Sequence, residues 1–230
     1  MNAILLADKM TPNTPLDVIA EANHRIANSL TVLVGMVRLQ AVTVKKKTEP
    51  LTNAEVRLLL EGIAARISTI GQLHRLLSHT PQDGCTSLRP HLREVSDALV
   101  AALSSSEQMV TVEHTGSDCM VMTRQVQPVI LILCEVFINA MKYAHPTGVR
   151  LAMTVDCATT ADGRLVITVA DDGIGLPDGF DPYLGGGLGF RVIRSLAAEV
   201  GASLEIHSSE LGLSFRLSIP AAAMPGGKLS

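Results

Sequence analysis

Apolar residues in the first third of the chain recur at steps of mostly three and four, and this spacing limits the possible folds more than any other feature. One such set covers residues 19–44 and a second covers residues 56–77. Each set places its apolar side chains on one face of an α-helix. Pro50, in the connection KKKTEPLTN, separates the two sets. Residues 14–79 are therefore predicted to form a helical hairpin.

A hairpin of two amphipathic helices leaves apolar surface uncovered. Pairing of two copies into a four-helix bundle is the simplest way to bury it. We therefore predict a homodimer that forms through residues 16–44 and 53–77.

The pattern changes at the segment SHTPQDGCT, which contains Pro and Gly and has no periodicity. Beyond it, in residues 86–220, predicted helices alternate with short strands. The helices are expected at residues 88–103, 126–143 and 188–200, and the strands at MVTVEH, CMVM, VRLAMTVDC, RLVITVA, SLEIHSS and LSFRLSIP. Strands in hairpins, with the helices grouped together, predict an α+β two-layer sandwich.

The composition indicates a cytoplasmic protein. The net charge is −3 and aromatic residues make up only 3%, which argues against nucleic acid as a partner. The four cysteines form no C-x-x-C pair, so neither a metal site nor a disulfide framework is expected. No apolar run of about 18 residues is found, so we expect no membrane segment in this chain.

The stretch EANHRIANSL places Glu21, His24 and Asn28 on one helix face, away from the apolar stripe. A neutral imidazole is a competent nucleophile near pH 7, and an acceptor on one ring nitrogen leaves the other free to react. An exposed histidine on a solvated helix face is the alternative, which this stretch by itself leaves open.

Chemistry is also indicated in EVFINAMKYAHP, where Glu135, Asn139 and Lys142 share one face of a predicted helix. Oxygen ligands beside an ammonium group suit Mg²⁺ together with phosphate. A solvated helix face again remains the alternative.

Two glycine motifs follow. DDGIGLP, residues 171–177, comes directly after a predicted strand, and GGGLGF, residues 185–190, opens a predicted helix. Glycines let backbone N–H groups approach a phosphate, and a helix N-terminus favours an anion. An ordinary turn and a flexible linker are the alternatives.

In this order the motifs resemble those of a histidine kinase over residues 16–220. The second half is similar to the ATP-binding domain shared by histidine kinases, gyrase and Hsp90-type chaperones, so the resemblance implies ATP and Mg²⁺ as cofactors. It implies that Asn139 coordinates Mg²⁺ and that Asp171 binds the adenine amino group. The other residues expected to bind the cofactor are Lys142, Tyr143, Gly173, Gly175, Gly185, Gly187 and Gly189.

The first motif is similar to the phosphoacceptor box E-x-x-H-R-x-x-N, which makes His24 the expected phosphorylated residue and Glu21 and Asn28 its catalytic neighbours. The chain is similar to a related branch named for its W-x-E signature but does not match that signature. It has no Trp, and Cys134 stands where that branch has a histidine.

The resemblance implies an ATP-dependent kinase that phosphorylates His24 and passes the phosphoryl group to an aspartate on a response regulator receiver domain. Glu135 is expected to orient or deprotonate the imidazole. Two other functions stay open at this point. One is a phosphotransfer or phosphatase protein of the same architecture that does not use ATP, and the other is a regulatory module that binds nucleotide and sequesters a partner.

Overall fold

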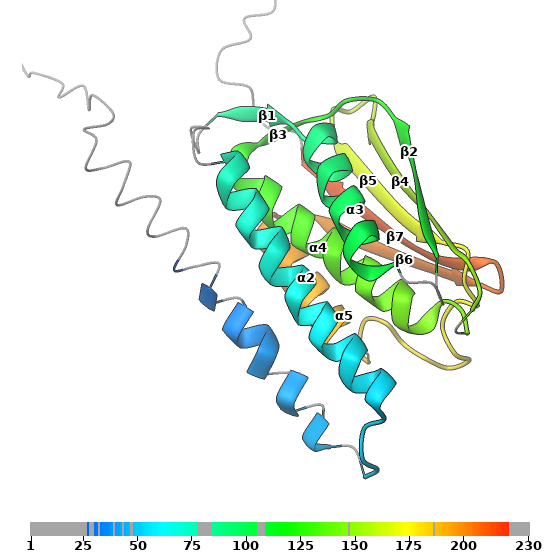
Figure 1. The fold of residues 1–230 in the computed structure, drawn as a ribbon. Coiled ribbons are helices and arrows are strands. Elements are labelled where there is room, and N and C mark those ends of the chain that lie inside the picture. Colours follow the sequence, from blue (N-terminus) through cyan, green and yellow to red (C-terminus); the bar gives the residue numbers. More distant parts are fainter. Residues whose placement is uncertain are drawn as a thin grey trace, which may run out of the picture.

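The structure, a computed structural model, describes residues 27–220 except for residues 28–29, 32, 39, 43, 47, 78–83, 105–108, 147 and 186. Figure 1 shows a pair of long helices beside an α+β unit. The described residues of the first helix between Ala27 and Lys45 are helical, and α2 spans Asn53–Leu77. These two helices form the predicted hairpin, whose expected start at residue 14 lies outside the described residues.

The helix α2 begins with a reciprocal cap. The backbone N–H of Glu55 donates to the Thr52 hydroxyl at 3.2 Å, and the Glu55 carboxylate accepts from the Thr52 backbone N–H at 2.8 Å. This is the capping box, which satisfies backbone donors that a helix start leaves free. Thr52 therefore caps α2, one residue before the Asn53 that the sequence pattern indicated.

The α+β unit contains a five-stranded mixed sheet in the order β2-β4-β5-β7-β6. Only the β2–β4 pair is parallel among these neighbours, and the other three pairs are antiparallel. The strands are β2 (Val110–Gly116), β4 (Leu151–Thr159), β5 (Leu165–Asp171), β6 (Ser203–Ser209) and β7 (Gly212–Ile219). A separate antiparallel pair joins β1 (Cys85–Ser87) to β3 (Met120–Met122). The sequence pattern missed β1, because three residues are too few to show an alternation.

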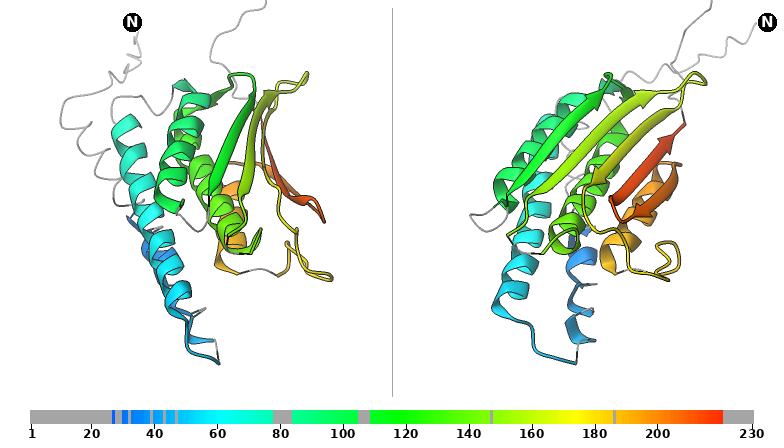
Figure 2. Two further views of the ribbon diagram at one scale, coloured as in Figure 1. Left: turned by 45° about the vertical axis from the view of Figure 1, so that its right-hand side comes forward. Right: turned by 90° about the vertical axis from the view of Figure 1, so that its right-hand side faces the viewer.

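Helices α3 (Arg89–Leu103), α4 (Thr123–Tyr143) and α5 (Leu188–Glu199) cover one face of this sheet, as Figure 2 shows. The predicted two-layer α+β sandwich is therefore confirmed. The start of α4 was predicted three residues too late. The side chain of Gln125 accepts from the Met122 backbone N–H at 3.2 Å, and the Thr123 hydroxyl donates to the Gly84 carbonyl at 3.1 Å, so the helix begins as soon as β3 ends.

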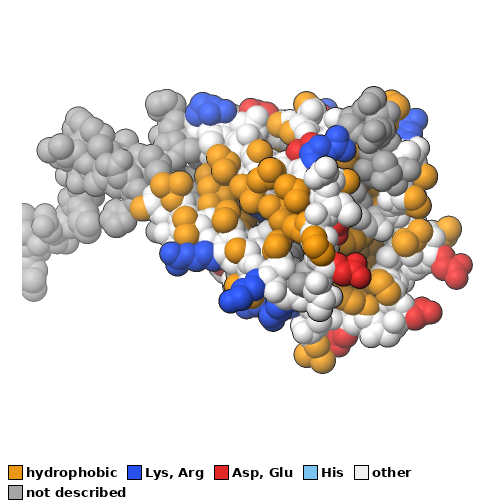
Figure 3. All heavy atoms as spheres, turned by 60° about the horizontal axis from the view of Figure 1, so that its bottom comes forward, with side chains coloured by type: hydrophobic (Ala, Val, Ile, Leu, Met, Phe, Trp, Pro, Cys, Tyr) orange, Lys and Arg blue, Asp and Glu red, His pale blue; other side chains and the backbone are white. Residues whose placement is uncertain are grey.

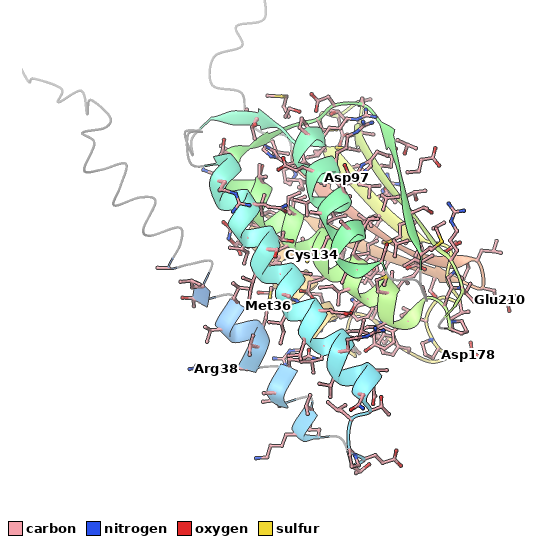
Figure 4. All side chains as sticks on the ribbon, viewed as in Figure 1. Met36, Arg38, Asp97, Cys134, Asp178 and Glu210 are labelled. Atoms are coloured by element: carbon pink, nitrogen blue, oxygen red, sulfur yellow. The ribbon has the colours of Figure 1, made fainter. Side chains whose placement is uncertain are left out.

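The hairpin adds a further layer to the sandwich, because α2 lies against α3 and α4. Ala65, Ile70 and Leu73 of α2 are buried in the same hydrophobic core as α4. From the first helix, Met36 points toward α2 and is buried, whereas Arg38 points away (Figure 4). A second copy is therefore not needed to cover the whole hairpin, because the chain's own α+β unit covers one side of it, and pairing of two copies stays a prediction.

One helix in the described part of the chain, α4, is long and apolar enough by composition to cross a membrane. However, 78% of its most apolar window is buried inside the protein. The sheet covers one side of α4 and the hairpin another, and a helix in that position is apolar all round.

The packing of the hairpin on the α+β unit is tested by Leu73→Ala. Leu73 is 1% exposed, so the truncation should lower the free energy of unfolding by about 2–5 kcal/mol. Leu211→Ala is the matched control, because Leu211 is 86% exposed in the turn between β6 and β7 and should change stability by less than about 0.5 kcal/mol. Urea denaturation measures both values. Equal, small effects would contradict the buried position of Leu73.

Candidate functional site

A cavity of about 470 Å³ opens where the C-terminal end of α4, the loop after β5 and the start of α5 meet the hairpin. The residues that line it come from all four of these elements and from β5 and β7. They are Gln40, Arg66, Val136, Asn139, Ala140, Lys142, Tyr143, Ala144, Asp171, Ile174, Gly175, Leu176, Pro177, Phe180, Gly187, Gly189, Phe190, Leu213 and Phe215. Its size is in the range of pockets that hold small organic ligands.

Asn139 presents an unsatisfied amide to this cavity. Its Nδ2 atom is buried and has no hydrogen-bond partner among the described residues. Buried polar groups are nearly always hydrogen-bonded, so such an atom in a cavity indicates a missing ligand. Gly189 lies directly against the amide, since a Cβ at that position would come within 2.8 Å of both amide atoms. A side chain there would displace the Asn139 amide.

Charged groups gather beside Asn139. Arg66 of α2 and Lys142 of α4 both line the cavity, and Glu135 lies beneath them with 1% exposure. Both Glu135 carboxylate oxygens accept hydrogen bonds from the Arg66 guanidinium. Burial lowers the pKa of Lys142, and the positive charge of Arg66 lowers that pKa further.

Asp171 lies at another wall of the cavity, at the end of β5. One of its oxygens, Oδ1, accepts from the backbone N–H groups of Gly173 at 2.9 Å and Leu213 at 3.2 Å. The other oxygen, Oδ2, has no hydrogen-bond partner among the described residues. Burial raises the pKa of this carboxyl group. The carboxylate is therefore fixed on one side and able to accept a hydrogen bond from a ligand on the other.

The loop after β5 is held against the end of α4. The backbone N–H of Ile174 donates to the Ala144 carbonyl at 3.0 Å, and the His145 imidazole lies 2.8 Å from the Asp172 carboxylate. Gly175 has a φ of 71° and lies against β6, where a Cβ would come within 2.3 Å of the Ser209 carbonyl oxygen. Both facts require glycine at this position. The loop geometry thus follows from DDGIGLP itself.

An apolar, aromatic wall completes the cavity. The Phe190 ring centroid is 5.6 Å from that of Phe180 and 5.7 Å from that of Phe215, in tilted arrangements. Three of the four Phe residues in the chain line this cavity, and the chain has no Trp. A flat, apolar ligand group is expected to bind there.

The segment between the two glycine motifs is attached to α5. The Asp181 carboxylate accepts from the backbone N–H of Tyr183 at 2.7 Å and of Leu184 at 3.1 Å. Arg194 of α5 donates to the carbonyl oxygens of Pro182 and Gly185. Exposed Asp178, labelled in Figure 4, marks the start of this segment.

Most of the residues predicted to bind the cofactor come together here. Seven of them line the cavity: Asn139, Lys142, Tyr143, Asp171, Gly175, Gly187 and Gly189. Gly173 and Gly185 do not, and they serve the local backbone instead. Gly173 packs against Ala144, and the backbone N–H of Gly185 donates to the Asp181 carbonyl at 2.7 Å.

Glu135 does not face the cavity as its spacing from Asn139 suggested, because Arg66 holds both of its oxygens. The predicted residues Glu21, His24 and Asn28 lie outside the described residues.

Sequence reasoning missed the two hairpin residues of the cavity, Gln40 and Arg66. A signal for Arg66 was present. Ile63, Arg66 and Ile70 follow the three-four spacing of the α2 stripe, so a cation occupies an apolar position. A charge at such a position needs a buried partner. No comparable signal marks Gln40.

The residues of the cavity would hold Mg²⁺ only together with a bound phosphate. The described residues contain no group of three or more His, Cys, Asp or Glu side chains that would hold a metal by themselves. Asn139 offers an amide to the cavity, whereas Glu135 is occupied by Arg66. Mg²⁺ commonly takes one or two protein oxygens and completes its shell with phosphate and water. This site is consistent with that arrangement.

Comparison with known families agrees with the fold and the cavity. Residues 21–103 match the model of a family described as histidine kinase. Residues 125–223 match the family of histidine kinase-, DNA gyrase B- and HSP90-like ATPases. The chain is therefore a histidine kinase core, related to the branch named for its W-x-E signature, with an ATPase domain of this family.

The individual relatives described next have low sequence identity to this chain. The sensor histidine kinase PdtaS of Mycobacterium tuberculosis is 28% identical over 208 residues, which cover 88% of this chain and 39% of that protein. The blue-light-activated histidine kinase 2 of Erythrobacter litoralis is 24% identical over 88% of this chain and 56% of that protein. The chain thus spans 39% of PdtaS and about half of the blue-light kinase.

A solved structure shares the fold. The histidine kinase domain of the Erythrobacter litoralis EL346 blue-light-activated histidine kinase superposes with a TM-score of 0.65 and 22% identity, over 89% of this chain and 91% of that one.

The role of Asp171 is tested by Asp171→Asn. A raised pKa means that the folded state favours the neutral form of this carboxyl group. The stability that this gives is present at low pH and is lost as the pH rises through the raised pKa. At pH 7 the amide, which keeps an oxygen for the two backbone N–H groups, should leave the free energy of unfolding equal or higher. It should weaken ATP binding at least tenfold, because the group facing the ligand no longer accepts.

Urea denaturation and titration with ATP measure these two effects. Asp97→Asn is the control, since Asp97 is exposed on α3, outside the cavity (Figure 4). Retention of wild-type ATP affinity by the Asp171 variant would contradict this assignment.

Proposed function

We propose that this chain is the catalytic core of an ATP-dependent protein-histidine kinase. It phosphorylates its own His24 and passes the phosphoryl group to an aspartate of a response regulator receiver domain. The observation that supports this most is the cavity, where the unsatisfied Asn139 amide, two cations and the free oxygen of Asp171 face one space. The match of residues 21–103 to the histidine kinase family includes the E-x-x-H-R-x-x-N motif.

The two ends of the cavity differ in chemistry, so ATP is expected to bind in one orientation. The adenine amino group donates to Asp171, and the base lies against the aromatic wall of Phe180, Phe190 and Phe215. The phosphates lie toward Asn139 and Lys142, near the start of α5, where the helix N-terminus favours an anion. The Asn139 amide oxygen and the phosphates would hold Mg²⁺, which would neutralise charge during transfer.

The reaction at His24 is a nucleophilic displacement. A ring nitrogen of the imidazole forms a bond to the γ-phosphorus, the bond from that phosphorus to the β–γ bridging oxygen breaks, and ADP leaves. The ring proton passes to a base or to water. Glu21 and Asn28, on the same predicted helix face, fix the tautomer and position of the imidazole. Glu135 can take part only when Arg66 releases one of its oxygens.

A homodimer fits the remaining surface. Figure 3 shows hydrophobic side chains gathered into one area on the face that it views. On the hairpin, the exposed large apolar residues include Leu30, Val34, Val37, Leu60 and Ile67. Spacings of four and three on the first helix and of seven on α2 place them in stripes, and a second hairpin is the surface that such stripes fit. We propose that two copies pair here and that residues 14–79 and 86–220 act as the phosphotransfer and ATP-binding domains.

We also propose that the chain works in the cytoplasm. All four cysteines are free thiols in the structure, which suits a reducing compartment.

The dimer is tested by the double substitution Leu60→Lys and Ile67→Lys. These side chains are 58% and 54% exposed, so the changes should leave the fold intact and place four charges in the interface of two copies. Light scattering should give a dimer mass for the wild type and a monomer mass for the variant. Leu211→Lys, at an exposed turn, should stay dimeric. A wild type that is monomeric throughout the concentration range would overturn the dimer.

The two chemical roles are separated by His24→Ala and Asn139→Ala. The first should abolish labelling from γ-labelled ATP and also acceptance of a phosphoryl group from a phosphorylated response regulator. The second should abolish labelling from ATP, because Mg²⁺ would lose an oxygen ligand, yet still allow exchange with the regulator.

Loss of the label in acid identifies phosphohistidine. Normal labelling of the Asn139 variant would show that the nucleotide site is misassigned. A wild type that accepts from a regulator but never labels from ATP would instead establish the phosphotransfer function.

A further inference from the structure

The Arg66 side chain, which belongs to the hairpin, faces the same cavity as the predicted ATP-binding residues. We propose that Arg66 is a phosphate-binding residue of the ATP site, so that the phosphoacceptor hairpin itself completes the nucleotide pocket. The proposal rests on the kinase function argued above and adds a residue outside the ATPase domain to its site.

The geometry of the guanidinium leaves one nitrogen for a ligand. Nε and Nη2 donate to the two oxygens of Glu135, the latter at 2.7 Å. Nη1 donates to no described residue. Gly62, one helical turn before Arg66, makes room for Nη1, since a Cβ there would lie 3.2 Å from that atom. A guanidinium held at one edge is preorganised to present the other edge to an oxyanion.

The local charge is unbalanced without an anionic ligand. Arg66 and Lys142 are both cationic, and Glu135 is the carboxylate that faces Arg66. The Arg66 side chain is 7% exposed, so its charge is poorly hydrated. Asp171 lies with the loop after β5 and accepts from backbone groups there. A polyphosphate at the Arg66–Lys142 end would supply the missing negative charge.

A consequence is coupling between the nucleotide and the hairpin. A ligand that contacts both Arg66 of α2 and Lys142 of α4 binds more tightly when α2 is docked on α4. By reciprocity, bound ATP favours the docked arrangement by the same factor. Adenosine lacks the phosphates and should not have this effect.

The test compares ATP with adenosine in variants that leave no unpaired carboxylate. Glu135→Gln is the reference, and Arg66→Met is added to it. The added change should weaken ATP binding by about 10- to 100-fold, the effect of a lost charged hydrogen bond, and change adenosine binding by less than about twofold. Competition against a fluorescent nucleotide measures both affinities. Arg57→Met is the control, because Arg57 is on the same helix but its side chain is 59% exposed.

Each outcome decides the proposal. Equal weakening of ATP and adenosine, or no weakening of either, would show that Arg66 only supports the packing of α2. If the double variant does not fold, Arg66→Lys in the same Glu135→Gln background replaces it, and again only ATP should weaken. A wild type that is never labelled by γ-labelled ATP would overturn the kinase function itself, which is a different result from loss of the Arg66 effect on binding.

Discussion

Burial of α4 on two sides is the constraint on which the rest of the structure depends. Fifteen of its 21 residues are buried, because the sheet lies on one side and α2 on another. Ridges of apolar side chains in such a position fix the helix against both layers. The C-terminal end of the same helix carries Asn139 and Lys142. The packing that stabilises the molecule thus also sets where the cavity lies.

This double burial explains the ion pair between the hairpin and the ATPase domain. Glu135 faces α2 from a buried helix, and an isolated carboxylate there would be costly. Arg66 supplies two hydrogen bonds to it across the interface. Burial works against the charge of Arg66, but the hydrogen bond and the charge of Glu135 raise its pKa overall. Such a pair contributes little net stability, but removal of one partner alone would leave a buried charge unpaired.

The helices, most strands and seven of the residues that line the cavity were predictable because their signals are local. Apolar spacing defines a helix face, and glycines in DDGIGLP report a backbone geometry that other residues resist. Gly173 and Gly185 lie in the same motifs, yet they contact Ala144 and Asp181 rather than the cavity. Which glycine faces a ligand depends on the neighbouring elements, and the motif does not contain that information.

The sequence by itself determined the class of the protein, the two helices of the hairpin and the order of the site motifs. Each of these depends on residues that are close together in the sequence. Only the tertiary structure decided that α2 packs on α4 and that Arg66 donates hydrogen bonds to Glu135. It also decided that Gln40 and Arg66 reach the cavity. Arg66 and Glu135 are 69 residues apart, and no local pattern relates them. Contacts between distant segments are selected by shape and charge in three dimensions, which is why they appear only when the chain is folded.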